Sequence, residues 1–122
     1  MIPKRRKPEP MNVREAPQIR CPSHLAWVRG FQCSVIDKRS AHECFGKIEA
    51  AHVRTGTDGG MGVKPSDCFV IPLCSAAHRE QHNVGEAEFE RIYGISMRKI
   101  ADQLWLKSPH GIKWRAENGE NR

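Results

Sequence analysis

The chain has 122 residues and a mass of 13.8 kDa, which is the length of one ordinary domain. Its 20 Lys and Arg residues against 14 Asp and Glu residues give a net charge of +6, which favours a polyanionic partner but is compatible with simple solubility. No stretch is apolar enough to cross a bilayer or to act as a signal peptide, and an odd number of cysteines, five, argues against a disulfide framework. We therefore expect a cytoplasmic protein with no membrane contact, whose thiols are free or bound to metal.

The N-terminal residues 1–20 combine several prolines and the basic run KRRK with few large apolar side chains. Such a composition buries too little surface to offset the entropy of ordering the chain. It predicts a flexible basic arm, which either contacts DNA or only keeps the protein soluble.

The first predicted elements are one helix and two strands. Ser23 is a typical N-cap, and apolar residues recur at helical spacing after it, which predicts a helix over residues 24–31. A cysteine-containing loop follows, and IEAAHV then predicts a strand over residues 48–53. The glycine-rich residues 54–66 predict a loop, and CFVIPL predicts a second strand over residues 68–73.

Three further helices are expected after the second strand. Ser75 can cap a helix that contains AAHREQH, EAEFERIY predicts another, and Ser96 can cap a third that contains MRKIADQLWL. In the last, Ile100, Leu104 and either Met97 or Ala101 form an apolar stripe. Residues 108–122 are polar and predict a C-terminal tail, so that the folded domain would span residues 21–107.

Two histidines are the first candidates for a functional site. His78 and His82 lie four residues apart in a predicted helix and can therefore share one cation, although two solvated or capping histidines give the same pattern. His52 on the first strand and Asp67 beside the second strand add a base and a carboxylate. Together the four residues are consistent with a hydrolytic centre that uses one metal ion.

The order of these motifs resembles a known superfamily. AHVR, GVKPSD, IPLC, HREQH and the pair Gly85-Glu86 are similar to the ββα-metal core of the HNH endonucleases, above all to the small phage and prophage nucleases related to the recombination-enhancement nuclease Ref. With its flanks the resemblance spans roughly His24 to Trp105. It implies an α+β fold with flanking helices and metal-dependent cleavage of DNA, together with a recombination or phage protein as a further partner.

The resemblance also assigns roles to individual residues. His52 falls on the general base, which takes a proton from the attacking water, and Asp67 falls on a residue that is either an oxygen ligand or an orienter of the base. His78 and His82 fall on the ligands of one divalent ion, for which Mg, Mn, Ni and Zn are the candidates. A departure is Ala51, where the superfamily often has a metal ligand; Glu49 could reach the site instead, or is a surface carboxylate.

A structural zinc site is implied as well, but half of its usual ligands are missing. Ile36 and Ala77 stand where the superfamily often has Cys or His. Cys44, with or without His42, could rebuild the site with Cys33 and Cys74, since tetrahedral zinc tolerates such changes. The alternative is that the three cysteines pack as small buried apolar residues.

Three basic residues near the expected centre, Arg54, Lys64 and Arg79, are candidates for phosphate contacts, although each could equally be a solvated charge. The sequence thus predicts an endonuclease of little sequence specificity. A non-catalytic DNA-binding or zinc-knuckle module on the same scaffold is the main alternative. An intracellular metal-binding or interaction protein would explain the histidine pair but neither His52 nor Asp67.

Overall fold

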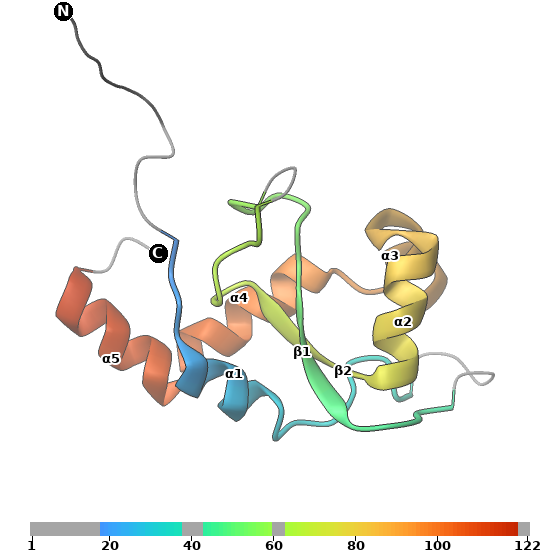
Figure 1. Ribbon diagram of the computed structural model, residues 1–122, viewed down its shortest axis with the longest axis horizontal. Coiled ribbons are helices and arrows are strands. Elements are labelled where there is room, and N and C mark those ends of the chain that lie inside the picture. The colour runs from blue at the N-terminus through green and yellow to red at the C-terminus, as the bar shows by residue number, and fades with distance from the viewer. Residues whose placement is uncertain (1–17, 38–42, 60–62, 120–122) are drawn as a thin grey trace, which may run out of the picture.

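The computed structural model describes residues 18–37, 43–59 and 63–119 (Figure 1). Within these residues the chain forms, in order, α1 (Pro22–Val28), β1 (Ile48–His52), β2 (Val70–Cys74), α2 (Ser75–Val84), α3 (Glu86–Tyr93), α4 (Met97–Lys107) and α5 (Pro109–Asn118). The two strands pair antiparallel, from Ile48 opposite Cys74 to His52 opposite Val70. The predicted α+β class is therefore confirmed.

Strand β2 lies at the centre of the domain, because helices pack against both of its faces. Every residue of β2 is buried, and its side chains join clusters on both faces of the sheet. Val70 packs with Val28 and Leu104 from the α1 and α4 side, whereas Ile71 and Leu73 join the larger cluster. The apolar run of β2 thus holds the sheet between two groups of helices.

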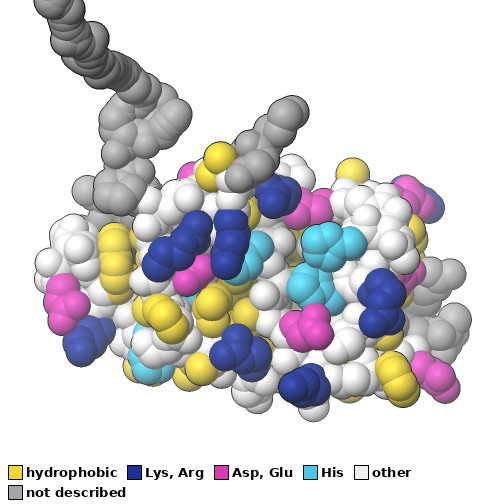
Figure 2. All heavy atoms as spheres, in the orientation of Figure 1, with side chains coloured by type: hydrophobic (Ala, Val, Ile, Leu, Met, Phe, Trp, Pro, Cys, Tyr) yellow, Lys and Arg dark blue, Asp and Glu magenta, His cyan; other side chains and the backbone are white. Residues whose placement is uncertain are grey.

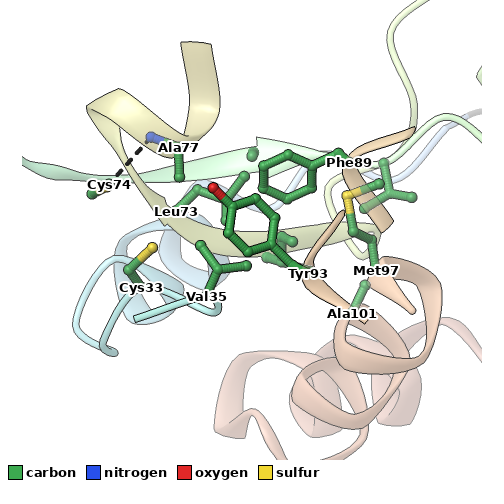
Figure 3. Close-up of a cluster of buried hydrophobic side chains, with 12 residues drawn as sticks. Cys33, Val35, Leu73, Cys74, Ala77, Phe89, Tyr93, Met97 and Ala101 are labelled. Atoms are coloured by element: carbon green, nitrogen blue, oxygen red, sulfur yellow. Dashed lines mark hydrogen bonds between the residues drawn. The ribbon is translucent and has the colours of Figure 1, made fainter. Parts of the chain in front are cut away.

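The larger cluster joins helices α2, α3 and α4 to β2 and to the loop that follows α1. Figure 3 shows Phe89, Tyr93, Met97 and Ala101 around Leu73, with Cys33 and Val35 from the loop closing one side. Gly85 separates α2 from α3 with φ +89°, a backbone conformation that favours glycine. The amphipathic α3 and α4 agree with their predicted positions, and Ser96 caps α4 by accepting from the N–H of Lys99.

The predicted strands and first helix exist, but their ends differ. Helix α1 begins at Pro22, before the predicted start, because proline is preset for the first turn of a helix. β1 ends one residue early at His52, and β2 runs from Val70 to Cys74. Cys74, and not Ser75, caps α2, since its Sγ accepts a hydrogen bond from the N–H of Ala77 at 3.4 Å.

The predicted polar tail after residue 107 is wrong, because Pro109–Asn118 form α5. Ser108 Oγ accepts from the N–H groups of His110 and Gly111, both at 3.2 Å, and Pro109 occupies the first turn. A Cβ on Gly111 would lie 2.5 Å from the carbonyl oxygen of Trp105, so glycine permits the close approach of α5 to α4. In the sequence, Ser108 followed by Pro109 is the pattern that indicates the start of this helix.

The predicted arm of residues 1–20 is too long at its C-terminal end. Residues 1–17 lie outside the described residues, but Ile19 is 2% exposed and its N–H donates to Ser66 Oγ at 2.9 Å. Its carbonyl oxygen accepts from the N–H of Asp67, also at 2.9 Å. The packed domain therefore includes residues before Cys21. Among the described residues, no helix has the length and apolarity needed to cross a membrane.

Candidate metal and hydrolytic site

His52 stands at the end of β1 and contacts the carboxylate of Asp67, which precedes β2. The distance from Nε2 of His52 to Oδ1 of Asp67 is 3.0 Å. Because an ionised carboxylate only accepts hydrogen bonds, Nε2 carries the proton and Nδ1 keeps its lone pair. Burial lowers the pKa of His52 and outweighs the raising effect of Asp67. The ring is therefore neutral near pH 7 and has one nitrogen able to accept a proton.

Asp67 is held in place by two further groups. It is buried, its Oδ2 accepts from the N–H of Cys21 at 2.8 Å, and Arg20 lies 3.4 Å from its Oδ1. Of the two predicted roles, an orienter of the base fits this geometry better than a metal ligand, since both oxygens are already engaged. The contact of Arg20 with Asp67 joins residues 47 apart, so no local pattern predicts it, and Arg20 falls within the predicted arm.

The predicted ligand pair on α2 has the geometry of a shared cation site. Nε2 of His78 and Nε2 of His82 lie 3.3 Å apart. Two imidazole nitrogens bound to one tetrahedral zinc, each at about 2.0–2.1 Å, are separated by about 3.4 Å. The two rings can therefore share an ion with little rearrangement.

Glu49 of β1 orients one of these rings. Its Oε1 lies 2.6 Å from Nδ1 of His78, and its Oε2 accepts from Ser75 Oγ at 2.7 Å. The hydrogen bond from His78, followed by that from Ser75, lowers the pKa of Glu49. Because Nδ1 of His78 donates to the carboxylate, its Nε2 presents a lone pair toward His82. The sequence alone allows two interpretations of Glu49, a surface carboxylate or a residue that reaches the site. In the structure its carboxylate contacts His78.

An open pocket of about 300 Å³ adjoins these groups and is lined by Glu49, Ser75, His78, Arg79 and His82. Figure 2 shows histidine side chains on one face of the molecule, over the end of β1 and between β1 and α2, with Lys and Arg side chains around them. Arg54, Lys64 and Arg79 are all exposed, as a phosphate contact requires, although Arg54 also donates to the carbonyl oxygen of Val63 at 3.0 Å.

A second candidate metal site lies at the start of α2. Cys33, Cys44 and Cys74 come from three separate segments, yet their sulfur atoms all lie within 4.8 Å of one another. Within the described part of the chain, no other group of three such residues meets this distance. The three thiols could hold a metal ion such as zinc. His42, the fourth predicted ligand, lies outside the described residues.

The surroundings shift the pKa values of two of the thiols in opposite directions. Cys44 is exposed, yet partial desolvation raises its pKa to about 12, and its contacts with Cys33 and Cys74 act in the same direction. Burial also raises the pKa of Cys74, but the backbone N–H groups of Ala77 and Phe45 and the neighbouring thiols outweigh it, so that the net change is downward. The fold therefore lowers the pKa of Cys74.

Comparison with known proteins gives one match. A family model described as "Protein of unknown function (DUF968)" matches residues 9–108, a range that holds both strands, the first four helices and all the site residues described above. No curated protein and no solved structure matches the chain.

Proposed function

The chain belongs to the DUF968 family of unknown function, and from its site we propose that it is a metal-dependent endonuclease that hydrolyses DNA phosphodiester bonds. β1, β2 and α2 would form the ββα-metal unit of an HNH-type nuclease of phage or prophage origin. The helices α1 and α4 would support this unit by packing against β2, and α5 would support α1 and α4.

The arrangement of His78 and His82 carries the proposal. Their Nε2 atoms face each other at a separation that suits one cation, and the Glu49 carboxylate fixes the orientation of His78. A carboxylate behind a ligating imidazole is a common support for metal ligands in proteins, because it sets the tautomer and raises ligand basicity. A bound Mg, Mn, Ni or Zn ion would neutralise charge on the scissile phosphate and on the leaving 3′ oxygen.

His52 would act as the general base. Its Nδ1 would accept a proton from a water molecule whose oxygen forms the new bond to phosphorus, while the bond from phosphorus to the 3′ oxygen breaks. Asp67 would hold Nε2–H and so keep the ring turned with Nδ1 available. The buried Asp67 is itself fixed by the N–H of Cys21, so that the base is positioned before substrate binds.

The thiol site would have a structural role. A zinc ion bound by Cys33, Cys44 and Cys74 would tie the loop after α1 to the start of α2, which carries the histidine pair. DNA would be held through Arg54, Lys64 and Arg79, in line with the net charge of +6.

A non-catalytic zinc-knuckle module that binds DNA is the second candidate. It is favoured by one observation: in the described residues only the three thiols bring three ligand atoms within 4.8 Å of one another. The histidine pair alone supplies two protein ligands to an ion, with the remaining positions left for water and phosphate.

Incubation of supercoiled plasmid with the protein separates the two candidates. We expect nicked and linear DNA with Mn²⁺, no cleavage with a chelator, and recovery when excess Mn²⁺ is added back. DNA binding without cleavage under every divalent ion tested would favour the non-catalytic module and contradict the nuclease.

A further inference from the structure

Helix α3 begins with a carboxylate that takes no part in the mechanism above. Glu86 belongs to the Gly85-Glu86 pair, and its side chain turns back toward the chain that leaves β1. Its Oε2 accepts from the backbone N–H of Arg54 at 2.7 Å, and its Oε1 accepts from the backbone N–H of Thr55 at 2.8 Å. One carboxylate therefore holds two successive amides that lie two and three residues after His52.

These two hydrogen bonds continue the ordering of the chain where strand pairing ends. The N–H of Val53 still donates to the carbonyl oxygen of Phe69 at 2.8 Å, just beyond the last paired residue of β1. The next two N–H groups would otherwise face solvent, and Glu86 takes both. Hydrogen bonds to a charged acceptor are about twice as strong as those between neutral groups. Every residue from His52 to Thr55 is therefore held by strand pairing or by a hydrogen bond from its backbone N–H.

The helix that carries Glu86 is packed into the core. Phe89 and Tyr93 anchor α3 in the larger core cluster, where they are 0% and 5% exposed. The loop is also held from α4, where Arg98 donates to the carbonyl oxygen of Gly56 and lies over the Phe69 ring at 4.7 Å. The carboxylate of Glu86 therefore connects the end of the catalytic strand to the core through a helix that carries none of the proposed catalytic groups.

We propose that Glu86 is a positioning residue for His52: it fixes the backbone beyond the base, while Asp67 fixes the ring. This inference rests on the proposed nuclease function. It also gives the Gly85-Glu86 pair a role, since the glycine permits the turn into α3 and the glutamate at the first helical position reaches the loop.

The test compares Glu86→Ala, Glu86→Gln and, as a matched control on the same helix, Glu88→Ala, which removes only an exposed ion pair with Arg91. We expect Glu86→Ala to lower kcat on plasmid DNA up to about 100-fold, the effect of displacing a reacting group by about 1 Å. KM for DNA and the Kd for Mn²⁺ should not change. Glu86→Gln keeps one acceptor oxygen and should fall between wild type and Glu86→Ala, and it remains informative should Glu86→Ala fail to fold.

Amide hydrogen exchange supplies a readout that does not depend on cleavage. Exchange at Arg54 and Thr55 should accelerate in Glu86→Ala and stay unchanged in Glu88→Ala. If the wild type cleaves DNA and the folded Glu86 variants keep its kcat, the positioning role is wrong while the nuclease stands. If the wild type does not cleave but exchange accelerates, the proposed function fails while the contact between Glu86 and the loop is supported.

Discussion

The two candidate metal sites meet at α2, since Cys74 is its N-cap and His78 and His82 lie on it, yet they differ in the origin of their ligands, in burial and in openness. The thiol site collects ligands from three segments, and two of its three sulfur-bearing residues are buried. The histidine site takes both ligands from one helix and opens into a pocket of about 300 Å³. Structural zinc sites are closed, whereas catalytic sites keep a position open for water or substrate. Under the proposed function, this difference would assign one metal to stability and the other to chemistry.

The largest effect is expected from removal of the proposed base, His52, which belongs to neither metal site. His52→Ala should lower the cleavage rate by about two to four orders of magnitude, because the general base acts in the transition state. It should leave the affinity for Mn²⁺ and the melting temperature close to those of wild type. Single-turnover cleavage of plasmid DNA measures the rate, and calorimetry measures the Mn²⁺ affinity and the melting temperature.

His110→Ala is a suitable control, since this histidine lies on α5 and is not part of either site. A His52→Ala variant that cleaves as fast as His110→Ala would show that another group activates the water.

Removal of a thiol should act on stability. Cys44 is the exposed member of the thiol site, so Cys44→Ser removes a ligand without opening a cavity in the core. A ligand present at about 1,000 times its Kd stabilises the folded state by about 4 kcal/mol, and most of this should be lost. Thermal unfolding with and without zinc measures the loss; an equal response of variant and wild type to zinc would exclude the thiol site.

Removal of a ligand from the histidine site should change metal binding and activity, and not the stability of the fold. His78→Ala or His82→Ala should weaken Mn²⁺ binding, and activity should return in part at higher Mn²⁺ concentration, while the response of stability to zinc stays that of wild type. Titration calorimetry on the zinc-loaded protein measures the affinity. Unchanged Mn²⁺ affinity in both variants would place the catalytic ion elsewhere.

A smaller effect is expected for the carboxylate behind His78. Glu49→Gln keeps an acceptor oxygen for the Nδ1–H of His78 but removes the negative charge that raises the basicity of the ring. Mn²⁺ affinity should therefore fall by about 10- to 100-fold, the usual effect of losing such a carboxylate partner. Glu80→Gln, on α2 but hydrogen-bonded to Tyr93, is the matched control. Equal Mn²⁺ affinity in the two variants would mean that the charge of Glu49 does not support the ligand.

The smallest effect concerns pH. Burial holds the pKa of His52 below its ordinary value, so the base is already neutral at pH 7. The single-turnover rate should therefore change less than about twofold between pH 7 and pH 8 and fall only as the pH drops below about 6.5. A tenfold rise from pH 7 to pH 8 would contradict a base with a lowered pKa.

Local patterns predicted much of the fold and part of the site. The spacing of His78 and His82 and the apolar stripe of α4 depend on helical periodicity, which a single sequence displays directly. The thiol site was reached only through a resemblance, because its cysteines are brought together by the tertiary fold. Contacts such as Glu49 with His78, 29 residues apart, and Arg20 with Asp67 left no local pattern to read.

Helix α5 was missed for a different reason. Its sequence has a weakly amphipathic pattern and contains a glycine, so composition favoured a tail. The helix forms because Ser108 caps it and because Gly111 and Trp114 pack against Trp105. Tertiary contacts therefore overrode a low local propensity.

The proposal of a structural metal at the thiols and a catalytic metal at the histidines is tested most directly by loading the two sites separately. Protein that carries zinc at the thiol site and has been dialysed free of other divalent ions should be fully folded and unable to cleave supercoiled plasmid. Added Mn²⁺ should then start cleavage without changing the zinc content or the circular dichroism spectrum. Cleavage by the zinc-loaded protein before any Mn²⁺ is added, or none at any Mn²⁺ concentration, would contradict a structural metal beside a separate catalytic one.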